Sequence, residues 1–156
     1  MIIYLIRHGK AELNSESGRD FDRSLTLKGK RKIEEISLRL NNLKIKIDKI
    51  YSSPYLRAKQ TAEIIKRHIL DECELEIINI LSPGCNTQLL LENILFQHDN
   101  IALVGHEPDM SRILSELCGA FNVTFKKGGI AKILFEGKPR IGAGCLEFLI
   151  TPKLLK

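Results

Sequence analysis

The sequence contains no tryptophan, and its aromatic content is only 6%. This scarcity argues against a surface for single-stranded nucleic acid, because such surfaces stack bases on aromatic rings. The four cysteines (73, 85, 118 and 145) are widely separated and form no Cys-x-x-Cys pair. That spacing argues against a metal cluster or a disulfide framework and favours the reduced thiols of a cytoplasmic protein. We therefore expect a cytoplasmic protein with no metal and no cofactor.

Long apolar runs are also missing, and none approaches the roughly 20 residues that a membrane-spanning helix needs. The N-terminus, "MIIYLIRHGK", has neither a basic leader segment nor a cleavage site of small residues. We therefore expect a strand there, with no signal peptide and no membrane contact. The length of 156 residues and the hydrophobic content of 44% predict one globular domain over residues 1–156.

The formal net charge is +5, and much of the excess lies in the segments 28–32, 44–49 and 125–129. A basic balance favours anionic partners, but it does not distinguish a phosphorylated substrate from a nucleic acid or from simple solubility. Because the three clusters are short and far apart in the sequence, we interpret them as separate solvated faces and expect no nucleic-acid partner.

Hydrophobic periodicity predicts strands that alternate with helices along the chain. The expected strands cover residues 2–6, 48–53, 75–79, 100–106, 130–137 and 145–151. The expected helices cover residues of about 27–43 and 87–97, with two further helices that begin at Pro54 and Pro108. Such alternation predicts an α/β fold, a three-layer α/β/α sandwich with a mostly parallel central sheet and a terminal hairpin.

Chemically active side chains follow two of the predicted buried strands directly. Arg7 and His8 end the first strand, and His106 ends the fourth. Arg57 lies in the first turn of the helix after the second strand. Ligands of such sheets bind beyond the carboxyl ends of the strands, so we expect these residues to converge on one edge.

This set of residue types suits a phosphoryl group. Arginine offers a planar fork of donors that matches phosphate oxygens. A neutral imidazole is a nucleophile when its other nitrogen is held by a hydrogen bond. Gly9, directly after His8, leaves room for a phosphate to approach the backbone. Phosphoryl transfer needs mainly positioning and charge stabilisation, which these groups supply without a metal.

Four segments in order carry a resemblance to a known family. They are "LIRHG", "DFDRSLTLKG", "SSPYLRAKQTA" and "VGHEP", and together they resemble the histidine phosphatase superfamily, which also contains the cofactor-dependent phosphoglycerate mutases. The second segment is similar to the D-x-x-R-x-L-T-x-x-G pattern of the small SixA-type phosphohistidine phosphatases. Lys10 departs from the family, in which an acidic residue is common at this position.

The resemblance implies a phosphoglycerate mutase-like fold and a role for each matching residue. His8 would attack phosphorus and become transiently phosphorylated. Arg7 and Arg57 would clamp the phosphoryl oxygens, and His106 would donate a further hydrogen bond to them. Water would then hydrolyse the intermediate, with no metal.

One departure from the larger family members bears on the substrate. They place an acidic residue after the third strand, but the stretch 79–88 here contains no Asp or Glu, although Glu12 and Glu107 lie near the motifs. An alkoxide leaves poorly without a general acid, which contributes about 10²–10⁴-fold. An imidazole leaves far more easily, because the pKa of its conjugate acid is about 6.5. The sequence therefore favours a phosphohistidine substrate.

Our hypothesis is a monomeric phosphatase that removes phosphate from histidine on a protein of the histidine-phosphotransfer type. Two alternatives stay open from the sequence. One is a phosphatase of the same superfamily for small phosphate esters, and the other is a catalytically weak module that binds phosphohistidine.

Overall fold

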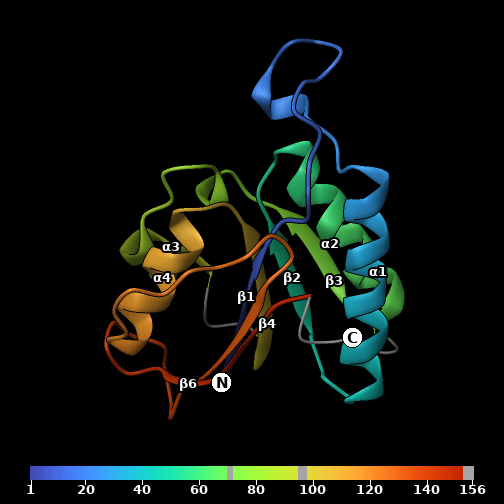
Figure 1. The fold of residues 1–156 in the computed structure, drawn as a ribbon. Coiled ribbons are helices and arrows are strands. Elements are labelled where there is room, and N and C mark those ends of the chain that lie inside the picture. The colour runs from blue at the N-terminus through green and yellow to red at the C-terminus, as the bar shows by residue number, and fades with distance from the viewer. Residues whose placement is uncertain (70–71, 95–97, 153–156) are drawn as a thin grey trace.

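In the computed structural model, the apolar N-terminal run forms an interior strand, β1 (Ile2–Arg7), of a six-stranded sheet (Figure 1). The structure describes residues 1–69, 72–94 and 98–152. The other strands are β2 (Lys49–Ser52), β3 (Glu74–Ile77), β4 (Asn100–Gly105), β5 (Ile130–Leu134) and β6 (Cys145–Ile150). The helices are α1 (Leu27–Asn42), α2 (Leu56–His68), α3 (Thr87–Ile94) and α4 (Asp109–Cys118).

The strand order in the sheet is β3-β2-β4-β1-β5-β6. The first four strands in this order are parallel, and β5 and β6 are antiparallel and form the terminal hairpin. Helices α1 and α2 cover one face of the sheet, and α3 and α4 cover the other (Figure 1). The prediction of a three-layer α/β/α fold with a mostly parallel sheet is confirmed.

Most predicted boundaries agree with the structure within a few residues, and the start of α2 differs from its predicted position by two residues. The helix begins at Leu56 with Tyr55 as its N-cap, and not at Pro54. The Ser53 hydroxyl, which was expected to cap this helix, accepts from the Tyr55 N–H at 3.3 Å and also lies 2.7 Å from His106 Nε2. Helix α3 is described as far as Ile94, and the rest of its predicted span, 95–97, lies outside the described residues.

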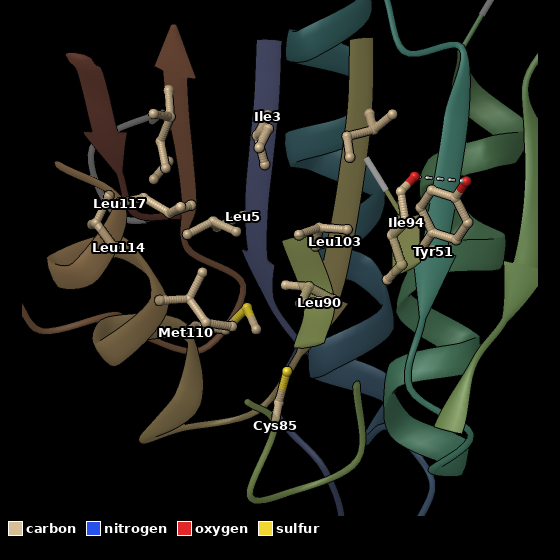
Figure 2. Packing of buried hydrophobic residues seen from close by; sticks show 14 of the residues in the cluster. Ile3, Leu5, Tyr51, Cys85, Leu90, Ile94, Leu103, Met110, Leu114 and Leu117 are labelled. Atoms are coloured by element: carbon tan, nitrogen blue, oxygen red, sulfur yellow. Dashed lines mark hydrogen bonds between the residues drawn. The ribbon is translucent and has the colours of Figure 1, made fainter. Parts of the chain in front are cut away.

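Alternate residues of β1 supply the two hydrophobic cores. Ile3 and Leu5 face α3 and α4, where they belong to one cluster with Met110 and Leu114 (Figure 2). Tyr4 and its neighbour Ile6 belong to the cluster on the side of α1 and α2. Burial on both faces explains why this strand reads as a continuous apolar run and not as an alternating one.

Helix α1 lies unusually close to the backbone that follows β1, and two glycines make this possible. A Cβ atom at Gly29 would lie only 2.2 Å from the Lys10 carbonyl oxygen. A Cβ at Gly9 would lie 3.0 Å from Ile33 and 3.2 Å from Leu25. Gly9 was expected to make room for a phosphate, whereas here its missing side chain makes room for the residues around α1. The close approach fixes the position of the strand end.

Replacing Gly29 with alanine therefore tests this packing. The methyl group would clash with a backbone atom that cannot rotate away, so we expect Gly29→Ala to lower the free energy of unfolding by about 1–3 kcal/mol. Urea denaturation would measure the loss. The matched control Lys30→Ala, on the same helix, should stay within about 0.5 kcal/mol of the wild type. A Gly29→Ala protein as stable as this control would contradict the packing argument.

Candidate active site

His8 is held at the end of β1 with one ring nitrogen anchored and the other directed toward Arg57. Its backbone N–H donates to the Gly105 carbonyl at 3.0 Å, which joins the ends of β1 and β4. Its Nδ1 lies 2.7 Å from the Gly9 carbonyl oxygen, which can only accept, so Nδ1 carries the hydrogen. Nε2 accepts from Arg57 Nε at 3.3 Å. The lone pair of the ring is therefore on Nε2.

Burial keeps this imidazole neutral. The His8 side chain is only 7% exposed, and this desolvation lowers its pKa from 6.5 to about 3. The hydrogen bond to Gly9 opposes the shift, whereas the positive charges of Arg57 and Arg7 add to it. At neutral pH the ring is consequently uncharged, as a nucleophilic histidine must be.

His106 follows β4 and faces His8 across the site, with the ring centroids 5.1 Å apart. Its Nε2 lies 2.7 Å from the Ser53 hydroxyl, and the Tyr55 ring meets it edge-on at 5.0 Å. Burial lowers the pKa of His106 from 6.5 to about 4. Its Nδ1 is buried and has no hydrogen-bond partner among the described residues, so this nitrogen is available to a ligand.

Arg7 and Arg57 lie beside the two rings, and both are partly engaged. Arg7 donates through Nη1 to the Phe125 carbonyl at 2.6 Å, while its buried Nε has no partner in the described structure. Burial lowers the pKa of Arg7, against the opposing charge of Glu107. The Arg57 side chain is buried, and its guanidinium lies 4.9 Å from the Tyr55 ring.

Asp20 is the chief residue that sequence reasoning did not assign. Its backbone carbonyl accepts from Arg57 Nη1 at 2.7 Å, and its carboxylate accepts from Nη2 at 2.9 Å. Arg23 donates to the same carboxylate at 2.7 Å. Partial burial alone would raise the pKa of Asp20, but the hydrogen bonds and charges of the two arginines outweigh it and lower the pKa. The D-x-x-R pattern of this segment was the available signal.

Asp20 belongs to the loop between β1 and α1, which projects beyond the end of the sheet (Figure 1). Arg23 both lines the site and closes this loop, since it also donates to the Glu12 carbonyl at 3.0 Å. The carboxylate of Asp20 therefore occupies part of the donor fork of Arg57 that a phosphate would use. A ligand that engages the whole fork must displace this carboxylate.

The four predicted residues line one cavity of about 410 Å³, together with side chains of the β1–α1 loop and of the segments after β3 and β4. The structure thus brings together all four residues that the sequence selected. A larger cavity of about 790 Å³ lies between β3 and α3. Its lining contains no histidine or arginine, so chemistry and not size identifies the candidate site.

Glu107 lines the active-site cavity, but its carboxylate is engaged elsewhere. It accepts hydrogen bonds from Ser111 Oγ at 2.6 Å and from the Phe125 backbone N–H at 3.0 Å. The segment that includes Pro83 is tied to α4 by Asp109, which accepts from the Gly84 N–H at 2.8 Å. Neither carboxylate is positioned as an unengaged acid in the cavity.

Within residues 1–69, 72–94 and 98–152, no three His, Cys, Asp or Glu side chains gather in a group that could hold a metal ion. In the same ranges, none of the helices combines the length and hydropathy that crossing a membrane requires.

Comparison with known proteins identifies the family. The model of the histidine phosphatase superfamily (branch 1) matches residues 3–79. An uncharacterized protein of Picosynechococcus is 32% identical, with 99% of each chain covered. Phosphohistidine phosphatase SixA of Escherichia coli is 27% identical, with 100% of this chain and 97% of the relative covered. This chain belongs to the histidine phosphatase superfamily.

The solved structures of this superfamily agree with the fold. The protein histidine phosphatase SixA, solved in complex with tungstate, superimposes with a TM-score of 0.87 at 25% identity, and both chains are covered completely. The resemblance stated from the four segments, to the superfamily and its SixA-type members, is thereby confirmed. Membership supports phosphatase activity, while the roles of His8, Arg7, Arg57 and His106 stay predictions.

The neutral state of buried His8 predicts how stability depends on pH. The unfolded chain takes up a proton near pH 6.5, but the folded chain does so only near pH 3. Protons therefore favour unfolding between these values, and the free energy of unfolding should fall as the pH falls from about 6.5 towards 3.

Denaturation curves at pH 7.5 and pH 5.0 measure this effect. From the higher to the lower pH, the wild type should lose on the order of 2 kcal/mol more than His8→Asn, which has no imidazole at this position. His106→Asn should also lose less stability than the wild type between these two pH values, because burial lowers the pKa of His106 as well. An unchanged pH dependence in both variants would show that the folded protein protonates these rings as readily as the unfolded chain does.

Proposed function

We propose that this protein is a phosphohistidine phosphatase that acts on a protein through a covalent intermediate on His8, without a metal. The observation that carries the proposal is a pair of buried nitrogens beside the neutral His8 ring, Arg7 Nε and His106 Nδ1, which have no hydrogen-bond partner among the residues that the structure describes. Buried polar atoms are rarely left unpaired, because each costs about 1–3 kcal/mol. The oxygens of a bound phosphoryl group would accept from both.

The first step exchanges one P–N bond for another. The Nε2 lone pair of His8 forms a bond to phosphorus while the bond from phosphorus to the substrate imidazole breaks. If the other nitrogen of the substrate ring carries a proton, the leaving group departs as a neutral imidazole and needs no acid. His8, with its hydrogen on Nδ1, becomes the phosphorylated imidazolium.

Water completes the cycle. Its oxygen attacks the phosphorus of phosphorylated His8, the P–N bond breaks and its electron pair returns to Nε2. Both protons of the water leave with the product as dihydrogen phosphate, so atoms and charge balance. The neutral ring that burial favours is thereby restored.

Arg7, Arg57 and His106 would stabilise the transferring group as its negative charge spreads over three oxygens. The Arg57 Nε–H donates to His8 Nε2 and occupies the one lone pair of that nitrogen, so Arg57 would transfer this hydrogen bond to a phosphoryl oxygen before His8 attacks. Asp20 would release part of the Arg57 fork when the phosphoryl group enters and would take it back when phosphate leaves. Arg57 thus always has an anionic partner.

The engaged carboxylates favour a P–N substrate over a P–O one. Esters of alkyl alcohols need a proton donor at the leaving oxygen. Glu107 Oε1 accepts from Ser111 Oγ and the Phe125 N–H, and Oε2 accepts from the Ser111 N–H at 3.1 Å. Segment 79–88 has no acidic residue. The alternative of a small-ester phosphatase therefore lacks an evident acid. A module that only binds phosphohistidine would have no need of a neutral nucleophile beside both arginines.

The proposed partner is a phosphorylated protein of the histidine-phosphotransfer type, and neither a nucleic acid nor a membrane. We also propose that the protein acts as a monomer in the cytoplasm. The separated cysteines support the location, and the complete set of site residues within one chain supports the monomer.

Hydrolysis of a phosphohistidine peptide in the presence of EDTA tests the mechanism. The wild type should remain active, and His8→Ala should lose at least roughly 1,000-fold in rate because the nucleophile is gone. His68→Ala, a histidine on the far part of α2, is the matched control and should keep wild-type activity. Full activity in His8→Ala would refute the nucleophile, whereas loss of wild-type activity in EDTA would refute metal independence.

Substrate preference is a separate measurement. The kcat/KM for the phosphohistidine peptide should exceed those for a panel of sugar phosphates by at least about 100-fold, the lower range of what a general acid contributes. Release of inorganic phosphate reports both reactions. A preference for the esters would replace the first hypothesis with the second.

A further inference from the structure

Four lysines line a second cavity, of about 210 Å³, beside the candidate active site. They are Lys10, Lys28, Lys32 and Lys127. In the sequence they belong to separate segments, two of which were interpreted as unrelated solvated faces. The basic side chains of 28–32 and 125–129 are exposed or half-buried as expected, but the interpretation that these segments are separate was wrong, because the fold brings them to one place.

The packing around the end of β1 explains this convergence. The Lys10 carbonyl accepts from the Thr26 N–H at 2.9 Å, which places the start of α1 against Lys10. On the other side, the Gly128 N–H lies 3.1 Å from the His8 carbonyl. Lys127 is therefore fixed next to the nucleophile's own backbone.

The four ammonium groups have no counter-charge within the described structure. Salt bridges and side-chain hydrogen bonds are absent for all four in residues 1–69, 72–94 and 98–152, and the cavity lining contains no acidic residue. Three of the side chains are exposed, and Lys32 is half-buried. Like charges around one cavity repel each other, so an anion placed among them would be attracted.

The second cavity adjoins the first. Lys127 lines both of them, and Gly9, which follows the nucleophile, lines the lysine cavity. A substrate whose phosphorylated ring lies against His8, and which extends beyond that ring, would thus place its flanking groups among the lysines.

We propose that this lysine cavity docks acidic side chains that flank the phosphohistidine of the protein substrate. The inference rests on the proposed function and adds to it the charge of the partner surface. The chemistry of the lining favours carboxylates over other anions. The lysine cavity is lined by no arginine, whose fork suits phosphates, and by no aromatic ring that could stack a base, whereas three arginines line the His8 cavity.

Two phosphohistidine peptides test this docking, one with glutamates on both sides of the phosphohistidine and one with glutamines. The wild type should hydrolyse the glutamate peptide with a KM roughly tenfold lower, with the difference shrinking in 1 M salt. The double variant Lys10→Gln/Lys32→Gln should lose most of this preference. The matched control Arg31→Gln/Lys66→Gln removes the same charge outside the cavity and should keep it. An equal preference in the two double variants would overturn the proposal.

Binding without turnover separates this inference from the proposed function. Fluorescence anisotropy of a labelled, unphosphorylated glutamate peptide should show weaker binding to the lysine double variant than to the control. Failure of the wild type to hydrolyse either peptide would refute the proposed function, and the anisotropy result would still decide the docking. A short single-stranded DNA of equal charge that displaces the glutamate peptide at lower concentration would overturn the assignment to carboxylates.

Discussion

The hydrogen bond from the His8 N–H to the Gly105 carbonyl fixes the geometry on which the site depends. It extends the parallel pairing of β1 and β4 by one residue, to the point where both chains leave the sheet. On the other side of β4, the Ser53 N–H donates to the Val104 carbonyl at 3.0 Å. Three separate segments thus end at one edge, and each delivers a polar side chain there.

Because these side chains emerge from buried strands, they are desolvated, and desolvation sets their chemistry. It keeps both imidazoles neutral, and Arg7 Nε and His106 Nδ1 are buried with no hydrogen-bond partner in the described part of the chain. Such a site is costly to leave empty of anions. Asp20 supplies one negative charge by pairing with Arg57. The β1–α1 loop is therefore part of the site, and its carboxylate competes with an anionic ligand for Arg57.

Much of the fold was predictable because its patterns are local. Buried strands such as β1 and β4 appear as apolar runs, and the face of α1 appears as a repeat of isoleucine and leucine. The start of α2 differs from the prediction by two residues. The Ser53 hydroxyl makes the local contact that the sequence suggests, with the Tyr55 N–H, and a second contact with His106, 53 positions away, which no local pattern shows.

The sequence by itself determined the α/β order, the family and the four candidate residues, since the carboxyl ends of parallel strands must share one edge. Only the tertiary structure decided which partners these residues have. Asp20 lies 37 positions from Arg57, and the lysines of the second cavity come from three separate segments. The D-x-x-R spacing can mark Asp20 as a candidate, but which residues these side chains contact follows from how loops and helices pack over the sheet.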